Sequence, residues 1–151
     1  MITARPLQLD FRLLALGVLL PDLIDKVVGP ASFYTTRMVG HTLAWALALA
    51  ILGTLLLRGR ARIGLLTVAA ASAIHLLQDQ MWRQNEVLLW PLYGWRFPAT
   101  GVRTAAERLQ DLARPEIYVP EIVGALILLA AAVRLSRQRA WRGFARGGRL
   151  P

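Results

Sequence analysis

Long apolar blocks separated by short polar segments are the main pattern of this chain. Four blocks run from about Phe11 to Val28, from Met38 to Leu57, from Ile63 to about Trp82, and from about Ile117 to Leu135. The second block contains twenty residues and one histidine. At a rise of about 1.5 Å per residue, a helix of that length spans roughly 30 Å, the thickness of one hydrocarbon core. The blocks therefore predict transmembrane helices.

The distribution of small and charged residues supports this prediction. A soluble helical domain needs a charged stripe along each helix, and neither the second block nor the segment from Ile122 to Val133 has one. Small residues such as Ala69–Ala71 and Ala130–Ala132 favour close approach of helices in lipid. We predict an all-α integral membrane bundle of about four short transmembrane helices. It would form a single domain over residues 1–135, followed by a basic cytoplasmic tail over residues 136–151.

The beginning of the chain also has features of a cleavable signal peptide. Arg5 and the apolar run from Leu13 to Leu20 imitate the basic and apolar regions of such a peptide. However, Pro21, Asp22 and Asp25 follow, and no small-x-small cleavage site accompanies them. We therefore expect the first block to remain as a helix.

Charge predicts how the helices are oriented. Hydrophobic residues make up 56% of the 151 residues and the mean hydropathy is +0.45, yet the net charge is +9. The basic residues lie between the apolar blocks. With four crossings, one side of the membrane holds eleven basic residues and one acid, Asp10, whereas the other side holds seven basic residues and eight acids. The positive-inside rule then predicts a multi-pass protein of the cell membrane with both termini in the cytoplasm.

Two parts of the polar sequence leave alternatives open. The arginine-rich segment from Arg134 to Arg149 is typical of a topology signal that also touches anionic lipid, so nucleic acid is the less favoured partner. Between the third and fourth blocks, five apolar residues recur at helical spacing and predict an amphipathic helix on the outer membrane surface, or one that only caps the bundle. They are Val102, Ala105, Ala106, Leu109 and Leu112.

Five ionisable residues lie at the outward ends of the predicted helices. The first helix ends with Asp22 and Asp25, the second begins near His41, and the third ends with His75 and Asp79. Ionisable groups in membrane segments need partners, and a metal ion can serve several at once. Imidazoles with carboxylates suit Zn²⁺, with Mn²⁺ or Fe²⁺ as alternatives. The absence of cysteine excludes thiolate ligands.

Each of these residues also has a purely structural interpretation. Asp25 can pair with Lys26 or with a lipid headgroup, and His41 can lie at the membrane interface without binding an ion. His75 and Asp79 are one helical turn apart and can form a plain hydrogen-bonded pair. Glu121 is better explained as a boundary residue than as a ligand.

Several short motifs occur in a characteristic order. They are Leu20-Pro21-Asp22 followed by Asp25, Gly40-His41-Thr42, His75-Leu76-Leu77-Gln78-Asp79, and Leu88-Leu89-Trp90-Pro91. Together they resemble the prokaryotic membrane-bound metal-dependent hydrolase family, which is distantly similar to zinc-dependent phospholipase C. The resemblance covers about half of the chain. It implies a metal site built from Asp22, Asp25, His41, His75 and Asp79, and with only two histidines these residues build at most a one- or two-metal centre.

The resemblance also implies an activity. We expect a metal-dependent hydrolase that acts on a phosphoester or lipid-linked substrate at the outer interface, with Asp25 or Asp79 as the general base. Two alternatives remain: a non-catalytic bundle held by a structural metal or by hydrogen bonds, and a small ion-handling protein. Four residues on the predicted outer side are candidates for substrate binding: Arg37, Arg83, Arg96 and Trp90.

Overall fold

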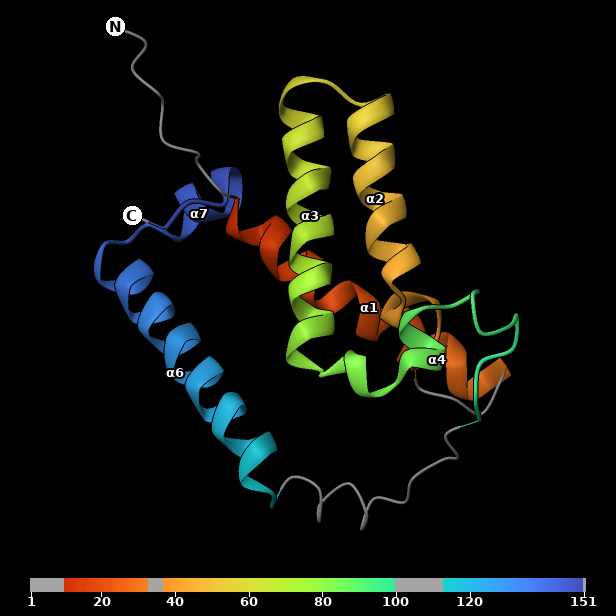
Figure 1. Cartoon of the computed structure of the whole chain (residues 1–151). Helices are drawn as coiled ribbons and strands as arrows, with labels where there is room; N and C mark the ends of the chain where they lie inside the picture. Colours follow the sequence, from red (N-terminus) through yellow and green to blue (C-terminus); the bar gives the residue numbers. More distant parts are fainter. Residues whose placement is uncertain (1–9, 33–36, 100–112, 151) are drawn as a thin grey trace, which may run out of the picture. The chain divides into compact units, whose positions relative to one another are not determined.

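The computed structural model describes residues 10–32, 37–99 and 113–150, and these residues form helices and no strand (Figure 1). The all-α prediction is therefore confirmed for them, whereas the predicted amphipathic helix around residues 102–112 lies outside the described residues. The elements are α1 (Phe11–Ser32), the 3-10 turn η1 (Val39–His41), α2 (Leu43–Leu56), α3 (Gly59–Gln78), the 3-10 turn η2 (Met81–Arg83), α4 (Asn85–Leu88), α6 (Pro115–Arg137) and α7 (Trp141–Gly147).

The chain divides into two compact units, residues 1–102 and residues 103–151. In the second unit, α6 contains the fourth predicted span, and the segment predicted as a basic tail contains the short helix α7. The indole Nε1 of Trp141 donates a hydrogen bond of 3.0 Å to the hydroxyl of Ser136. This contact holds the start of α7 to the end of α6.

The helices of the first unit differ in their capacity to cross a membrane. By length and composition, α3 is the helix of the described residues that qualifies as a span. Helix α2 is apolar but has fourteen residues, a length of about 21 Å. Three of its large side chains are nevertheless exposed: Leu47, Ile51 and Leu55. Apolar surface of this extent is typical of a membrane protein, and the count of four spans stays a prediction.

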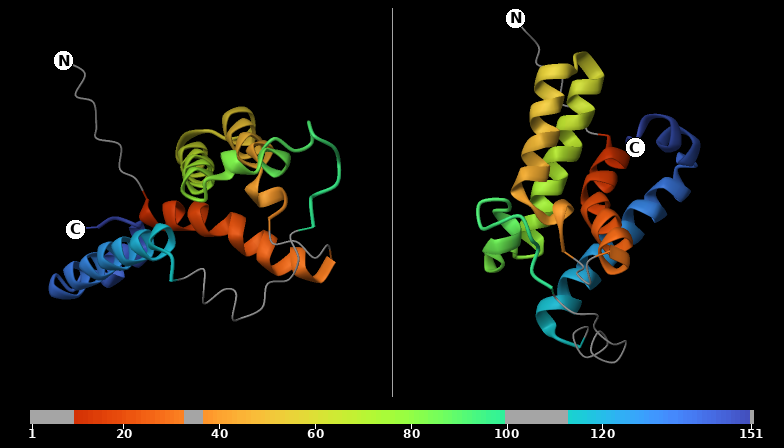
Figure 2. Two further views of the ribbon diagram at one scale, coloured as in Figure 1. Left: turned by 60° about the horizontal axis from the view of Figure 1, so that its bottom comes forward. Right: turned by 90° about the vertical axis from the view of Figure 1, so that its right-hand side faces the viewer.

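Helix α1 crosses α3 at a contact made by a glycine and a serine (Figure 2). Pro21 lies inside α1 without ending it, and because proline lacks an N–H group, the carbonyl of Gly17 has no donor four residues later. The hydroxyl of Ser72 on α3 donates to that carbonyl at 2.9 Å. A Cβ atom on Gly17 would lie 2.6 Å from the Cβ of Ala71, so glycine allows this approach.

Helix α2 begins at Leu43, five residues after the predicted start of the block. Thr42 caps it, since its hydroxyl accepts a hydrogen bond of 3.0 Å from the N–H of Trp45. The residues before this cap leave the helical path because the N–H groups of Met38 and Gly40 donate to the carboxylate of Asp25. An apolar pattern shows where a block begins but carries no information about such a long-range capture.

The segment after α3 folds back against the end of that helix. Leu76, Met81 and Val87 form a small buried cluster, with Leu88 and Phe97 packed against it. Helix α3 ends at Gln78 because Gln80 adopts a left-handed backbone conformation with a φ of 52°. This turn fixes the position of Asp79 at the end of α3.

Candidate metal centre

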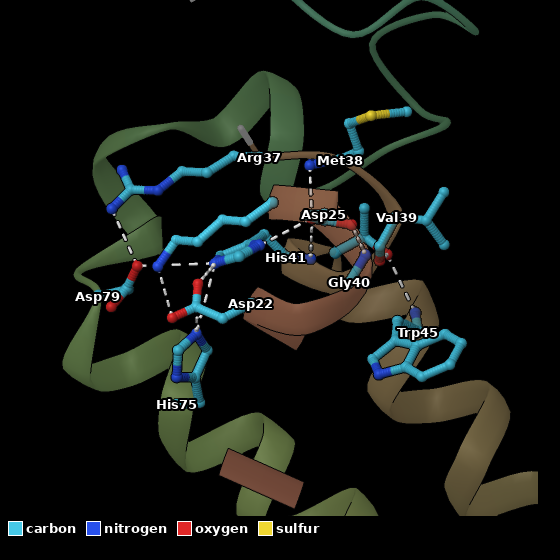
Figure 3. A network of polar contacts seen from close by, with 12 residues as sticks. Asp22, Asp25, Arg37, Met38, Val39, Gly40, His41, Trp45, His75 and Asp79 are labelled. Carbon is cyan, nitrogen blue, oxygen red and sulfur yellow. Dashed lines mark hydrogen bonds and ion pairs between the residues drawn. The ribbon is translucent and has the colours of Figure 1, made fainter. Parts of the chain in front are cut away.

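All five predicted ligand residues meet at one place, where α1, η1 and α3 come together (Figure 3). Asp22 and Asp25 lie three positions apart on one side of α1, and because α1 continues to Ser32 they lie inside this helix and not at its end as predicted. His41 closes η1, His75 is in the last turn of α3, and Asp79 caps that helix. Residues from three separate segments of the chain therefore form one cluster.

Three donor atoms form a compact triangle within this cluster. The Nε2 atoms of His41 and His75 are 3.3 Å apart, and Oδ1 of Asp22 lies 3.4 Å from the former and 3.8 Å from the latter. Three such atoms can all reach an ion bound between them. The spacing is also close to that of ligands in a tetrahedral site, where a metal–ligand distance of about 2.05 Å implies about 3.3 Å between ligands.

The other imidazole nitrogen of His41 contacts the carboxylate of Asp25. Its Nδ1 atom lies 2.7 Å from Oδ2 of Asp25, and both side chains are 1% exposed. The carboxylate of Asp25 also accepts hydrogen bonds from the N–H groups of Met38, Gly40 and His41 itself. With Nδ1 of His41 facing a carboxylate, a neutral imidazole carries its proton there and presents a lone pair at Nε2.

The third member of the triangle contains an unusual oxygen atom. Oδ1 of Asp22 is fully shielded from solvent, and no donor among the described residues forms a hydrogen bond with it. Its partner Oδ2 is paired with the ammonium group of Lys26 at 2.7 Å. A buried carboxylate oxygen without a donor calls for an unseen water or ion. The two imidazole nitrogen atoms of the triangle lie 3.4 and 3.8 Å from it.

A second carboxylate stands beside the triangle. Oδ2 of Asp79 lies 3.7 Å from Nε2 of His41 and accepts a hydrogen bond of 2.9 Å from the guanidinium group of Arg37. Asp22 and Asp79 are each about 30% exposed at the side chain, so the cluster opens to its surroundings on this side. The site thus has a buried wall of imidazoles and an open edge of carboxylates and cations.

Comparison with known proteins assigns the chain to a family. The family model described as YdjM inner membrane protein matches residues 2–147, almost the whole chain. The chain belongs to the YdjM family. No curated protein and no solved structure matches it. Membership in a family of inner membrane proteins supports the predicted cell-membrane location and a lipid bilayer as its environment.

The predicted substrate-binding residues differ in how they relate to the cluster in this member of the YdjM family. Arg83 and Arg96 are exposed, in η2 and in the segment after α4. The ring of Trp90 stacks on Phe97 at 5.3 Å and meets Trp95 edge-on at 5.5 Å. Of the predicted substrate-binding residues, only Arg37 has an ion pair with a carboxylate of the cluster.

From the sequence, Lys26 is expected to pair with Asp25. In the structure it pairs instead with Asp22, four residues earlier on α1. The i,i+4 spacing on a helix is the signal that favours this partner, because residues at that separation share a face. The backbone donors around Asp25 have no comparable signal in the sequence.

Proposed function

We propose that this cluster binds one divalent metal ion through Asp22, His41 and His75, and that the bound ion serves a hydrolytic reaction at the outer face of the inner membrane. The buried Oδ1 of Asp22, to which no donor of the described residues forms a hydrogen bond and which faces two imidazole nitrogens, is the observation that carries this proposal. Zn²⁺ suits the donor set best, with Mn²⁺ or Fe²⁺ as alternatives. The substrate class we propose is a phosphoester or a lipid-linked ester.

The geometry fits such an ion without large movement. The edges of the triangle, 3.3, 3.4 and 3.8 Å, are within about half an ångström of the roughly 3.3 Å expected between tetrahedral ligands. Asp79 lies next to His41 and is available at the fourth position, either as a ligand or as a partner of a water molecule there. Three protein ligands with an exchangeable fourth position are the usual arrangement of catalytic zinc.

The bound ion, Asp25 and Asp79 have different roles in the proposed reaction. When bound, the ion would polarise the substrate and lower the pKa of a water molecule. Asp25 fixes the tautomer and orientation of His41, because its oxygens are already engaged by backbone N–H groups and by Nδ1. Asp79 lies at the open edge and takes the proton of the attacking water as general base. The proposal thus gives the base role to Asp79 and a positioning role to Asp25.

One observation supports a second candidate, a structural network without catalysis. A protonated His41 would lie 3.4 Å from Asp22, 2.7 Å from Asp25 and 3.7 Å from Asp79, an arrangement that can hold α1, η1 and the end of α3 together by ion pairs alone. A small ion-handling protein would use the same acids as a relay. Metal binding distinguishes the structural network from the proposal, and ion flux in proteoliposomes identifies the relay.

The test uses the full-length protein purified in detergent. We expect one equivalent of zinc by elemental analysis after equilibration, and loss of that zinc in Asp22→Asn and His75→Ala. The matched control is Asp10→Asn, because Asp10 precedes the same helix about 18 Å away and pairs with Arg12. Hydrolysis of a chromogenic phosphodiester should follow the zinc content of the variants. A wild-type protein that binds no divalent ion would refute the metal site, and zinc binding without turnover would refute the hydrolytic part of the proposal.

A further inference from the structure

The charged side chains of the candidate metal centre do not balance. Lys26 pairs with Asp22 and Arg37 pairs with Asp79, whereas Asp25 contacts His41, so these three carboxylates and two cations carry a charge of −1 when both imidazoles are neutral. A divalent ion changes this charge to +1. Unbalanced charge is costly next to a membrane interior, so the loaded site has a reason to take up one further negative charge.

We infer that Lys26 and Arg37 form an anion-binding pair, and that the metal-loaded site takes a monoanionic phosphodiester group between them. This inference rests on the proposed function and names its substrate class. The two cations bind the two carboxylates of the open edge, with Lys26 at 2.7 Å from Asp22 and Arg37 at 2.9 Å from Asp79. When a metal ion draws on these carboxylates, both cations can turn toward an oxyanion at the same edge.

The exposure of the side chains gives the direction of access. His41 and Asp25 are 1% exposed and His75 is 7% exposed, so these residues close the inner wall. Lys26, in contrast, is 60% exposed and Arg37 is 31% exposed. An anion that approaches from the exposed side meets these two cations, and Figure 3 shows Arg37 next to Asp79 at the edge of the cluster. A phosphodiester carries the single negative charge that the loaded site lacks.

The choice of residue at position 26 is also informative. The chain contains seventeen arginines and a single lysine, Lys26. The other basic residues are arginine, whose planar group suits bidentate pairs, whereas an ammonium group is a compact charge on a flexible stem. A lysine can exchange a carboxylate for a phosphate oxygen by a small rotation. Its uniqueness also provides a specific probe, because reductive ¹³C-methylation labels one side chain and keeps its charge.

The first experiment follows this label. In full-length protein loaded with Zn²⁺ in detergent, diethyl phosphate should shift the ¹³C-methyl resonance of Lys26, and it should not do so in metal-free protein. Nanodiscs of phosphatidylglycerol, compared with nanodiscs of a neutral galactolipid that has no phosphate, ask whether the anion is a lipid headgroup. A shift with diethyl phosphate and none with phosphatidylglycerol identifies a soluble phosphodiester, and the reverse identifies lipid. No shift with either in metal-loaded protein overturns the inference.

The second experiment compares two affinities that should change in opposite directions, that for diethyl phosphate and that for the metal ion. In Lys26→Gln we expect the affinity for diethyl phosphate, followed by the visible spectrum of Co²⁺-loaded protein, to fall about tenfold. The affinity for Co²⁺ itself should rise severalfold, because a competing cation has left Asp22. Arg60→Gln, which removes an exposed cation at the start of α3, is the control and should change neither. Equal weakening of both affinities would make Lys26 only a support of Asp22 and would overturn the inference. Unchanged phosphate affinity would overturn it as well.

The two proposals fail in different ways. Metal binding without phosphodiester binding refutes the anion pair and leaves the metal centre intact. Absence of metal binding in the wild type refutes both.

Discussion

The imidazole rings of His41 and His75 meet with their Nε2 atoms 3.3 Å apart, although 34 positions separate the two residues in the chain. The rings stand at 63° to each other, with a centroid distance of 5.2 Å. Because Asp25 holds Nδ1 of His41, the Nε2 atom of a neutral His41 ring has a lone pair that faces Nε2 of His75. A contact of this length between two imidazole nitrogens needs a shared proton or a shared ion, and the predictions about the site test which of the two is present.

Asp25→Asn should weaken zinc binding about 10- to 100-fold while leaving the protein folded. The substitution removes the negative charge behind His41 and replaces one acceptor oxygen with a donor that faces backbone N–H groups. Titration with a fluorescent zinc competitor measures the affinity. Zinc affinity equal to that of Asp10→Asn would show that His41 does not depend on this support.

Gly40→Ala should impair the same support without removing any functional group. A Cβ atom at Gly40 would lie 2.7 Å from the carbonyl oxygen of Pro21 and 3.1 Å from Oδ1 of Asp25, so η1 must move away from α1. We expect a loss of about 1–3 kcal/mol in stability together with weaker zinc binding. Thermal unfolding and zinc titration of one preparation test both effects, and unchanged values would contradict the packing at η1.

Gly17→Ala should destabilise the contact between α1 and α3 by about 1–3 kcal/mol, because its Cβ would lie 2.6 Å from the backbone oxygen of Val68. The matched control is Gly53→Ala in α2, whose Cβ would be 3.4 Å from its nearest neighbour, an ordinary contact. That control should be neutral or slightly stabilising, since alanine favours a helix. Thermal unfolding in one detergent compares them, and equal effects would argue against the close approach.

Zinc should raise the midpoint of thermal unfolding of the wild type and leave that of His75→Ala unchanged. An ion at one hundred times its dissociation constant stabilises the folded state by about 2.7 kcal/mol. Such binding ties together α1, η1 and α3, since one ligand comes from each. A scan with and without a chelator measures the shift. An equal shift in His75→Ala would place the binding of zinc elsewhere.

The predicted orientation can be tested with single thiols, because the chain contains no cysteine. Tyr93→Cys, in the exposed segment after α4, should react with an impermeant maleimide added outside intact spheroplasts. Arg60→Cys, at the exposed start of α3, should react only after the membrane is permeabilised. The opposite result would place the candidate metal centre on the cytoplasmic face and would remove the outer-interface part of the proposal.

The apolar blocks alone determined that this chain is helical and belongs in a membrane, because both properties depend on local composition and length. The spacing of three between Asp22 and Asp25 and of four between His75 and Asp79 also set which side chains share a helix face. These local regularities made the grouping of the five site residues predictable. The start of α2 was not predictable, since backbone donors there turn toward a carboxylate from another helix.

Only the tertiary structure decided the different positions of the acids. Asp22 and Asp25 are similar in sequence, yet one has a buried oxygen facing two imidazoles and the other is surrounded by N–H groups. The docking of α1 on α3 through Gly17 and Ser72 produces this difference, because it sets the depth at which each turn of α1 meets its neighbours. A pattern along one helix describes which side chains lie together, whereas the contact between helices determines which atoms they meet.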